Sequence, residues 1–233
     1  MQRDRSPNRS WLRYALIAFL TILVVLSAIF IFFDRVAAFY VNRFTDYRFA
    51  YDKWGAGPFD RSDIENARIA LKGSEAGIRA REIHFDFDIY RWLAEREIAL
   101  SCQMKDVFFE VKGENVPRLF PADSVLAKPF GPDQKYDRIE FRFFSDKKET
   151  RLSNFRARSD DIKVTGDYTF LKEKDEVSVD FKISFSPEFS SSFDENIREN
   201  VLSVDEDGWY STIINYKGNA LLLKALYSFT IAP

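Results

Sequence analysis

Apolar and polar residues alternate along most of the chain after about residue 45. Successive side chains of a β-strand point to opposite faces, so this period of two predicts strands with one apolar and one polar face. The clearest case is 78–89, which we predict to be one long strand. Its apolar face is Ile83, Phe85, Phe87 and Ile89, and its polar face carries His84, Asp86 and Asp88.

The same alternation predicts a series of further strands. They lie near 47–51, 67–71, 98–111, 139–143, 162–170, 177–185 and 209–218. Asp106 interrupts the apolar face of 98–111 and predicts a bend or bulge rather than a new domain. Turn-forming residues at 172–176 and at 205–208 separate neighbouring strands, so we expect an antiparallel meander. Residues 113–135 contain four prolines, which predicts a loop between two β blocks or a lid over one end of the sheet.

Two segments after residue 45 have the spacing of helices. Residues 90–97 predict a short amphipathic helical turn. A longer helix is predicted over 187–202, with Ser186 as its N-cap and Pro187 at its first position. Its apolar stripe is Phe189, Phe193, Ile197 and Val201. This helix is expected to cover part of the apolar face of the sheet, and residues 219–233 are expected to close it as a helical turn or strand.

Residues 14–33 form an uncharged run of 20 residues that we interpret as a transmembrane helix. Residues 1–13 carry four arginines and one aspartate, so they should form a cytoplasmic tail by the positive-inside rule. A helical neck is predicted over 34–44, and the β domain 45–233 would then lie outside the cytoplasm. The alternative is a cleaved signal peptide ending near 36–38, but the run is longer than the usual apolar region of a signal.

The composition excludes several classes of protein function. Without the first 13 residues the chain has 30 basic and 35 acidic residues, a net charge of −5, which argues against a nucleic-acid partner. Cys102 is the only cysteine, which excludes an intrachain disulfide and thiolate metal clusters. His84 is the only histidine, which excludes multi-histidine metal sites. We therefore predict no enzyme activity, no catalytic residues, no metal and no cofactor.

The polar residues that attract attention also have ordinary explanations. His84, Asp86 and Asp88 would share one strand face, where three side chains rarely converge on one ion, and two aspartates side by side do not form a glycosidase cleft. A Ser-His-Asp triad would need His84, but the sequence has no nucleophile elbow. The segment 205–208 lacks the remaining ligands of a calcium loop and reads as an Asp-Gly turn. Cys102 is expected to be a small buried residue.

The predicted fold class is mainly β: an N-terminal transmembrane helix, then a twisted, mostly antiparallel sheet with one or two short covering helices. The order of features resembles the AsmA-like superfamily. A basic tail, a membrane helix and a neck lead into "DIENARIALKGSEAGIRAREIHFDFDIYRWLAEREIALSCQMKDVFFEV". The segment "FSPEFSSSFDENIRENVLSVDEDGWYSTIINYKGN" resembles the end of small members such as the type II secretion N-subunit group, although the usual proline after it is missing.

This resemblance implies a β-sheet groove anchored in the bacterial inner membrane, with a role in envelope biogenesis. It implies no catalytic residues. We expect membrane lipid as a partner, through the bilayer and through acyl chains, and envelope proteins as further partners. The candidate apolar groove is Ile83, Phe85, Phe87, Ile89, Phe109, Phe141, Phe143, Phe181 and Phe185.

Three alternatives remain open from the sequence. The apolar residues could form a closed core instead of a groove. The chain could be a structural or assembly subunit of a secretion system, of the type II N-subunit kind. It could also be an LptC-like lipopolysaccharide-transport component, although the long helix predicted over 187–202 fits that poorly.

Overall fold

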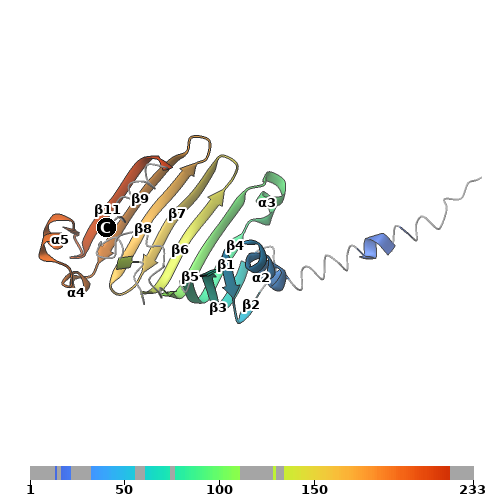
Figure 1. Cartoon of the computed structure of the whole chain (residues 1–233), viewed down its shortest axis with the longest axis horizontal. Coiled ribbons are helices and arrows are strands. Elements are labelled where there is room, and N and C mark those ends of the chain that lie inside the picture. The colour runs from blue at the N-terminus through green and yellow to red at the C-terminus, as the bar shows by residue number, and fades with distance from the viewer. Residues whose placement is uncertain are drawn as a thin grey trace, which may run out of the picture.

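One antiparallel sheet of 11 strands dominates the computed structural model, which describes residues 14, 17–21, 33–55, 61–73, 77–110, 128–129 and 134–220. The strand order is β1-β3-β4-β5-β6-β7-β8-β9-β11-β10, and β2 pairs with β3 (Figure 1). From β3 to β9 each strand pairs with the next one along the chain. The predicted mainly β, antiparallel meander is therefore confirmed.

The strands are mostly ten or more residues long, and the helices are short. The strands are β1 (Tyr47–Ala50), β2 (Lys53–Gly55), β3 (Arg61–Leu71), β4 (Gly77–Phe87), β5 (Ile98–Glu110), β6 (Lys135–Ser145), β7 (Glu149–Arg158), β8 (Ile162–Leu171), β9 (Glu176–Phe185), β10 (Ser203–Val204) and β11 (Tyr210–Asn219). The helices are α2 (Phe33–Phe44), α3 (Ile89–Glu95), α4 (Pro187–Ser190) and α5 (Glu195–Asn200).

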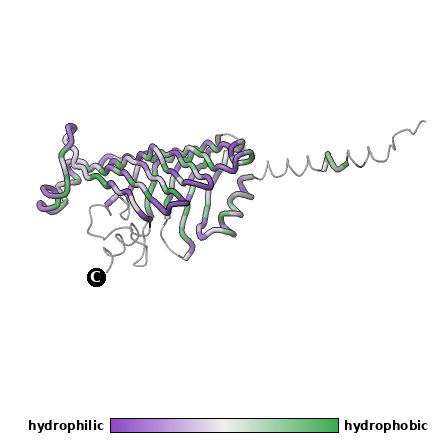
Figure 2. The backbone as a smooth tube through the Cα atoms, turned by 90° about the horizontal axis from the view of Figure 1, so that it is seen from above, coloured by the Kyte–Doolittle hydropathy of each residue, from purple (hydrophilic) through white to green (hydrophobic). Residues whose placement is uncertain are grey.

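Apolar and polar residues alternate along the strands, as Figure 2 shows by hydropathy. The alternation survives an irregularity inside β5, where Asp106 adopts a positive φ of 48° and the strand continues to Glu110. This confirms the bend predicted at Asp106 within a single strand. The pairing of β5 with β4 and with β6 keeps its register across Asp106, so the apolar residues change phase together in the three strands and stay on one face.

Strand β7 was missed by the sequence analysis. Its apolar residues are Leu152, Phe155 and Ala157, which do not keep a period of two. The reason is Asn154, which has a φ of 54° and whose backbone N–H donates to Asp167 Oδ1 at 2.8 Å. The pairing of β7 with β8 shifts there between Leu152 and Phe155, so the bulge hides the strand from a search for strict alternation.

The strand predicted over 78–89 ends early. β4 stops at Phe87, and Asp88 becomes the N-cap of α3, where its side chain accepts a hydrogen bond from the Arg91 backbone N–H at 3.1 Å. Ile89 is therefore the first residue of a helix, and its prediction as a member of the strand's apolar face is wrong. The predicted helical turn after it is confirmed.

The single helix predicted over 187–202 is two short helices. The predicted cap at Ser186 is confirmed, since its Oγ accepts from the Phe189 backbone N–H at 3.1 Å. After α4 the hydroxyls of Ser191 and Ser192 donate to carbonyls three residues back. Asp194 then starts α5 as a second N-cap. Serine side chains that bond their own backbone compete with helix continuation, which explains the break.

The predicted membrane span and cytoplasmic tail lie almost entirely outside the described residues. Among the helices of the described part, none is both long and apolar enough to cross a membrane. The helical neck predicted over 34–44 corresponds to α2. This helix is tied to the first strand by two hydrogen bonds between Asn42 and the backbone of Phe49. The loop or lid predicted over 113–135 and the closing segment 219–233 also fall mainly outside the described residues.

Candidate functional site

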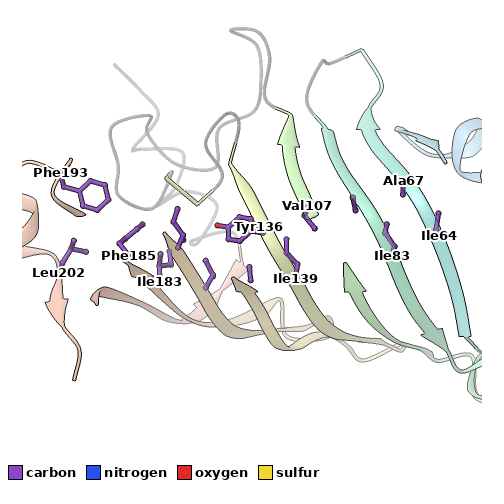
Figure 3. Packing of buried hydrophobic residues seen from close by; sticks show 14 residues of the cluster. Ile64, Ala67, Ile83, Val107, Tyr136, Ile139, Ile183, Phe185, Phe193 and Leu202 are labelled. Carbon is purple, nitrogen blue, oxygen red and sulfur yellow. The ribbon is translucent and has the colours of Figure 1, made fainter. Parts of the chain in front are cut away.

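The register of the sheet arranges the apolar side chains in rows that cross the strands. One row, here called the buried row, has six members that are nearly inaccessible and one, Met104, that is half-buried (Figure 3). Its members are Ile64, Ile83, Met104, Ile139, Ala157, Val164 and Ile183. The buried row is the main part of the hydrophobic core.

Beside the buried row, a second set of residues closes the apolar face. Tyr136 is 1% exposed and its hydroxyl donates to the Pro129 carbonyl at 3.0 Å. Phe185, Phe189 and Phe193 form an aromatic cluster with ring centroids 5.0 to 5.9 Å apart. Helices α4 and α5 therefore cover the β9 end of the face, as the sequence predicted for this segment, although as two helices.

A parallel row lies four residues from the buried row in β4, β5, β6, β8 and β9 and five residues from it in β7, and this row is only half-buried. We call it the apolar row. It consists of Phe87, Leu100, Phe143, Leu152, Tyr168, Val179 and Tyr216, which are paired in register from β4 to β11. Adjacent strands lie about 4.8 Å apart, so the seven side chains span about 29 Å of apolar surface.

Of the nine predicted groove residues, only Ile83 belongs to the buried row and only Phe87 and Phe143 belong to the apolar row. Ile83 and Phe185 are buried and belong to the core. Phe85, Phe87, Phe109, Phe141, Phe143 and Phe181 are half-buried on the same face. Ile89 lies in α3 and not on a strand. The structure therefore brings eight of the nine onto one face, of which Phe87 and Phe143 belong to the apolar row.

Five members of the apolar row were not predicted as groove residues. Leu100, Val179 and Tyr216 lie in strands that the alternation does identify, and Tyr168 stands in the apolar set of β8. Leu152 lies in the missed strand β7. Most of the predicted groove residues are phenylalanines. The turn at 172–176 fixes the pairing of Tyr168 with Val179, so these two could also have been predicted from the sequence.

The opposite face is polar and held by ion pairs. Glu110 accepts from Arg68 at 2.8 Å and from Arg79 at 2.6 Å, which ties β3, β4 and β5 together. Asp106 accepts from Arg81 at 2.9 Å. These pairs are well exposed, and each contributes at most about 1 kcal/mol to stability. These side chains are spread along the face, which indicates a solvated surface and not a site where several side chains meet one ligand.

His84 has the environment of this solvated face. Its Nδ1 contacts Asp63 on the adjacent strand, and Glu82 accepts from Lys105 at 2.8 Å. Asp86 is exposed, and Asp88 is occupied as the cap of α3. Within the described residues, no group of three His, Cys, Asp or Glu side chains is placed to hold a metal ion.

Several ionisable groups on the apolar face have shifted pKa values, among them Cys102 and Tyr136. Burial raises the pKa of the Cys102 thiol from 9.0 to about 12. Burial also raises the pKa of the Tyr136 hydroxyl. Both shifts keep the group neutral, which suits an apolar surface and not a reactive nucleophile. The sequence predicted a small buried residue at Cys102, and the structure makes this residue half-buried.

The acidic turn at 205–208 is built around Asp205. Its carboxylate accepts from Lys182 Nζ at 2.8 Å and from Ser211 Oγ at 3.0 Å. The hydrogen bond from Lys182 lowers the pKa of Asp205, with a further contribution from Ser211. Gly208 has a φ of 78°, which a glycine adopts without strain. Asp205 therefore stabilises a turn between β10 and β11.

No protein-family model matches this chain, and no curated protein and no solved structure matches it either. The functional argument therefore rests on the sheet itself.

Proposed function

We propose that this chain is a membrane-anchored, non-enzymatic β-sheet protein of the bacterial envelope, which binds the acyl chains of lipid on the apolar row. The observation that carries the proposal is the half-exposure of seven aligned apolar side chains beside the buried row. A monomeric soluble protein rarely keeps such a continuous apolar surface open to water.

The dimensions of the apolar row suit an acyl chain. The hydrocarbon core of a bilayer is about 30 Å thick, so one leaflet contributes chains of about 15 Å. The apolar row is about 29 Å long, so an acyl chain of this length can lie along it. Each methylene taken out of water contributes about 0.8 kcal/mol, so a bound chain would also remove the cost of exposing the row.

The features of the sequence place this function at the inner membrane. The uncharged run 14–33 leads directly into α2, and the basic tail 1–13 favours a cytoplasmic N-terminus and a periplasmic sheet. The resemblance to AsmA-like proteins supports the same assignment. A lipid-binding sheet anchored there would help to hold or move lipid during envelope biogenesis.

The experiment uses the solubilised full chain and two matched variants. Leu152→Arg places a charge on the apolar row, and Ser153→Arg places the same charge on the next residue, which faces the polar side. Native mass spectrometry and lipid extraction measure the phospholipid that co-purifies. We expect lipid with the wild type and with Ser153→Arg, and a severalfold loss with Leu152→Arg.

Other outcomes would contradict the proposal. A wild-type protein without co-purifying lipid, or equal lipid in both variants, would mean that the row does not bind acyl chains. In that case the face would be closed within the chain or by a protein partner. Crosslinking in cells from position 152 would identify a partner of the secretion-subunit type.

A further inference from the structure

Helix α3 exposes three large apolar side chains that do not pack into the core. Tyr90 is 82% exposed, Leu93 is 66% exposed and Trp92 is 49% exposed. We call this surface the α3 tip. The helix is held by its ends: Asp88 caps the N-terminus, and Arg96 ends it with a φ of 58° while Glu97 N–H donates to the Arg91 carbonyl at 3.3 Å. The apolar side chains are therefore not needed to keep α3 in place.

The α3 tip lies at the same end of the sheet as the start of α2 (Figure 1). Aromatic contacts run between the two. The Tyr51 hydroxyl donates to Asp34 in the first turn of α2 at 2.9 Å, Trp54 lies 5.6 Å from the Tyr51 ring, and Phe85 lies 5.9 Å from Trp54. Two residues beyond, Phe87 lies 6.4 Å from the Trp92 ring.

This position matters because the predicted membrane span ends where α2 begins. Residues 14–33 are the uncharged run, and Phe33 is the first residue of α2. A bilayer crossed by this run would face the β1–β5 end of the sheet. Tryptophan and tyrosine are the residues that favour the headgroup region of a bilayer, because one part of the ring is apolar and the other part is polar.

The polar face beside α3 carries both arginines and carboxylates. A hollow of about 1020 Å³ there is lined by three of each, Arg91, Arg142, Arg151, Asp86, Asp88 and Glu149. Arg151 pairs with Glu149 at 2.7 Å and Arg91 lies 3.6 Å from Asp88. Arg142 makes no ion pair with any other described residue. A basic side chain near a membrane that contains anionic lipid is attracted to its surface.

We propose that the α3 tip docks on the surface of the membrane that anchors the chain. Tyr90, Trp92 and Leu93 enter the headgroup region, and Arg142 faces lipid phosphates. This second contact fixes the sheet against the bilayer and places Phe87, the first member of the apolar row, next to the lipid. The inference rests on the proposed membrane anchor but not on lipid binding along the row.

The test measures depth by spin labelling of the full chain in vesicles of phosphatidylcholine and phosphatidylglycerol in equal amounts. In a Cys102→Ser background, a label is attached after Leu93→Cys or Tyr90→Cys. The control is Ile213→Cys, because Ile213 is 65% exposed on the polar face of β11, at the far end of the sheet. Collision rates with oxygen and with a water-soluble nickel chelate are recorded.

We expect labels at 93 and 90 to collide severalfold more with oxygen, and severalfold less with the nickel chelate, than the label at 213. Equal exposure of all three labels to the chelate, in chains that float with the vesicles, would overturn docking and leave the anchor intact. If the chains do not float with the vesicles, both the proposed membrane anchor and the proposed docking are wrong. Lipid co-purification on the apolar row is measured separately and does not depend on either result.

Discussion

Gly166 shows how closely the strands of this sheet approach each other. An added Cβ would lie 2.3 Å from the Asp180 carbonyl oxygen and 2.6 Å from the ring of Phe181. Phe155 and Phe181 meet edge to face beside it, with ring centroids 5.7 Å apart. The glycine therefore provides the space in which these two rings pack.

We expect Gly166→Ala to lower the free energy of unfolding by about 1–3 kcal/mol, the usual cost of overpacking. Thr165→Ala, one residue away and exposed on the polar face, should change it by less than about 0.5 kcal/mol. Urea titration of the solubilised full chain, followed by tryptophan fluorescence, measures both. Equal midpoints for the two variants would mean that Phe181 moves aside at little cost.

Cys102 gives a prediction that depends on pH. Its pKa is 9.0 in an unfolded chain and about 12 in the sheet. A thiol whose pKa is raised by folding contributes stability below pH 9, and this contribution is lost as the pH rises from 9 to 12. At pH 8 the thiolate fraction in the folded chain should be about a thousandfold lower than in urea.

Alkylation kinetics with iodoacetamide check the prediction for Cys102. We expect the rate at pH 8 to rise by about a thousandfold when the chain is unfolded in urea, since the thiolate is the reacting form. Cys102→Ser should remove the reaction in both conditions. A folded chain that reacts as fast as the unfolded one would show that the thiol is open to water.

Among the elements, α4 depends on its first residue. Ser186 is 8% exposed, donates to Asp161 Oδ1 at 2.9 Å and accepts from the Phe189 backbone N–H. It therefore joins the turn before β8 to the helix that covers Phe185. The aromatic cluster of Phe185, Phe189 and Phe193 relies on this placement.

We expect Ser186→Ala to destabilise the protein by about 1–2 kcal/mol, because it removes a cap and leaves a partly buried carboxylate with one fewer donor. Ser191→Ala is the matched control, since Ser191 is exposed and lies at the end of the same helix. Thermal unfolding followed by circular dichroism compares them. A similar loss in both variants would point to the serine content of the segment rather than to the cap.

The limits of sequence prediction are clearest at the scale of the elements. Strict alternation identified β4, β6, β8 and β9, because each of them has apolar residues at every second position on the inner face. It failed at β7, where the bulge at Asn154 breaks the period, and at Ile89, where one capping aspartate ends a strand. The spacing of Phe189 and Phe193 indicated a helix, but the local hydrogen bonds of Ser191 and Ser192 divide it.

At the scale of the whole molecule, the sequence predicted the class of fold and the existence of one apolar face. It did not predict which apolar residues are closed and which are open. Burial of Ile83 and half-exposure of Phe143 follow from the position of each residue along its strand, and from what lies over that position. Alternation alone gives the same pattern for both residues. The members of the apolar row can therefore be identified only when the pairing register of the strands is known.

The consecutive pairing of β3 through β9 has a consequence for how the chain reaches this shape. Each strand meets a partner that has been made just before it, so most long strands pair across a short loop with low loop-closure cost. The sheet can therefore grow hairpin by hairpin from its N-terminal side while later residues are still being synthesised. This order leaves few unpaired strands waiting for a partner that lies far away in the sequence.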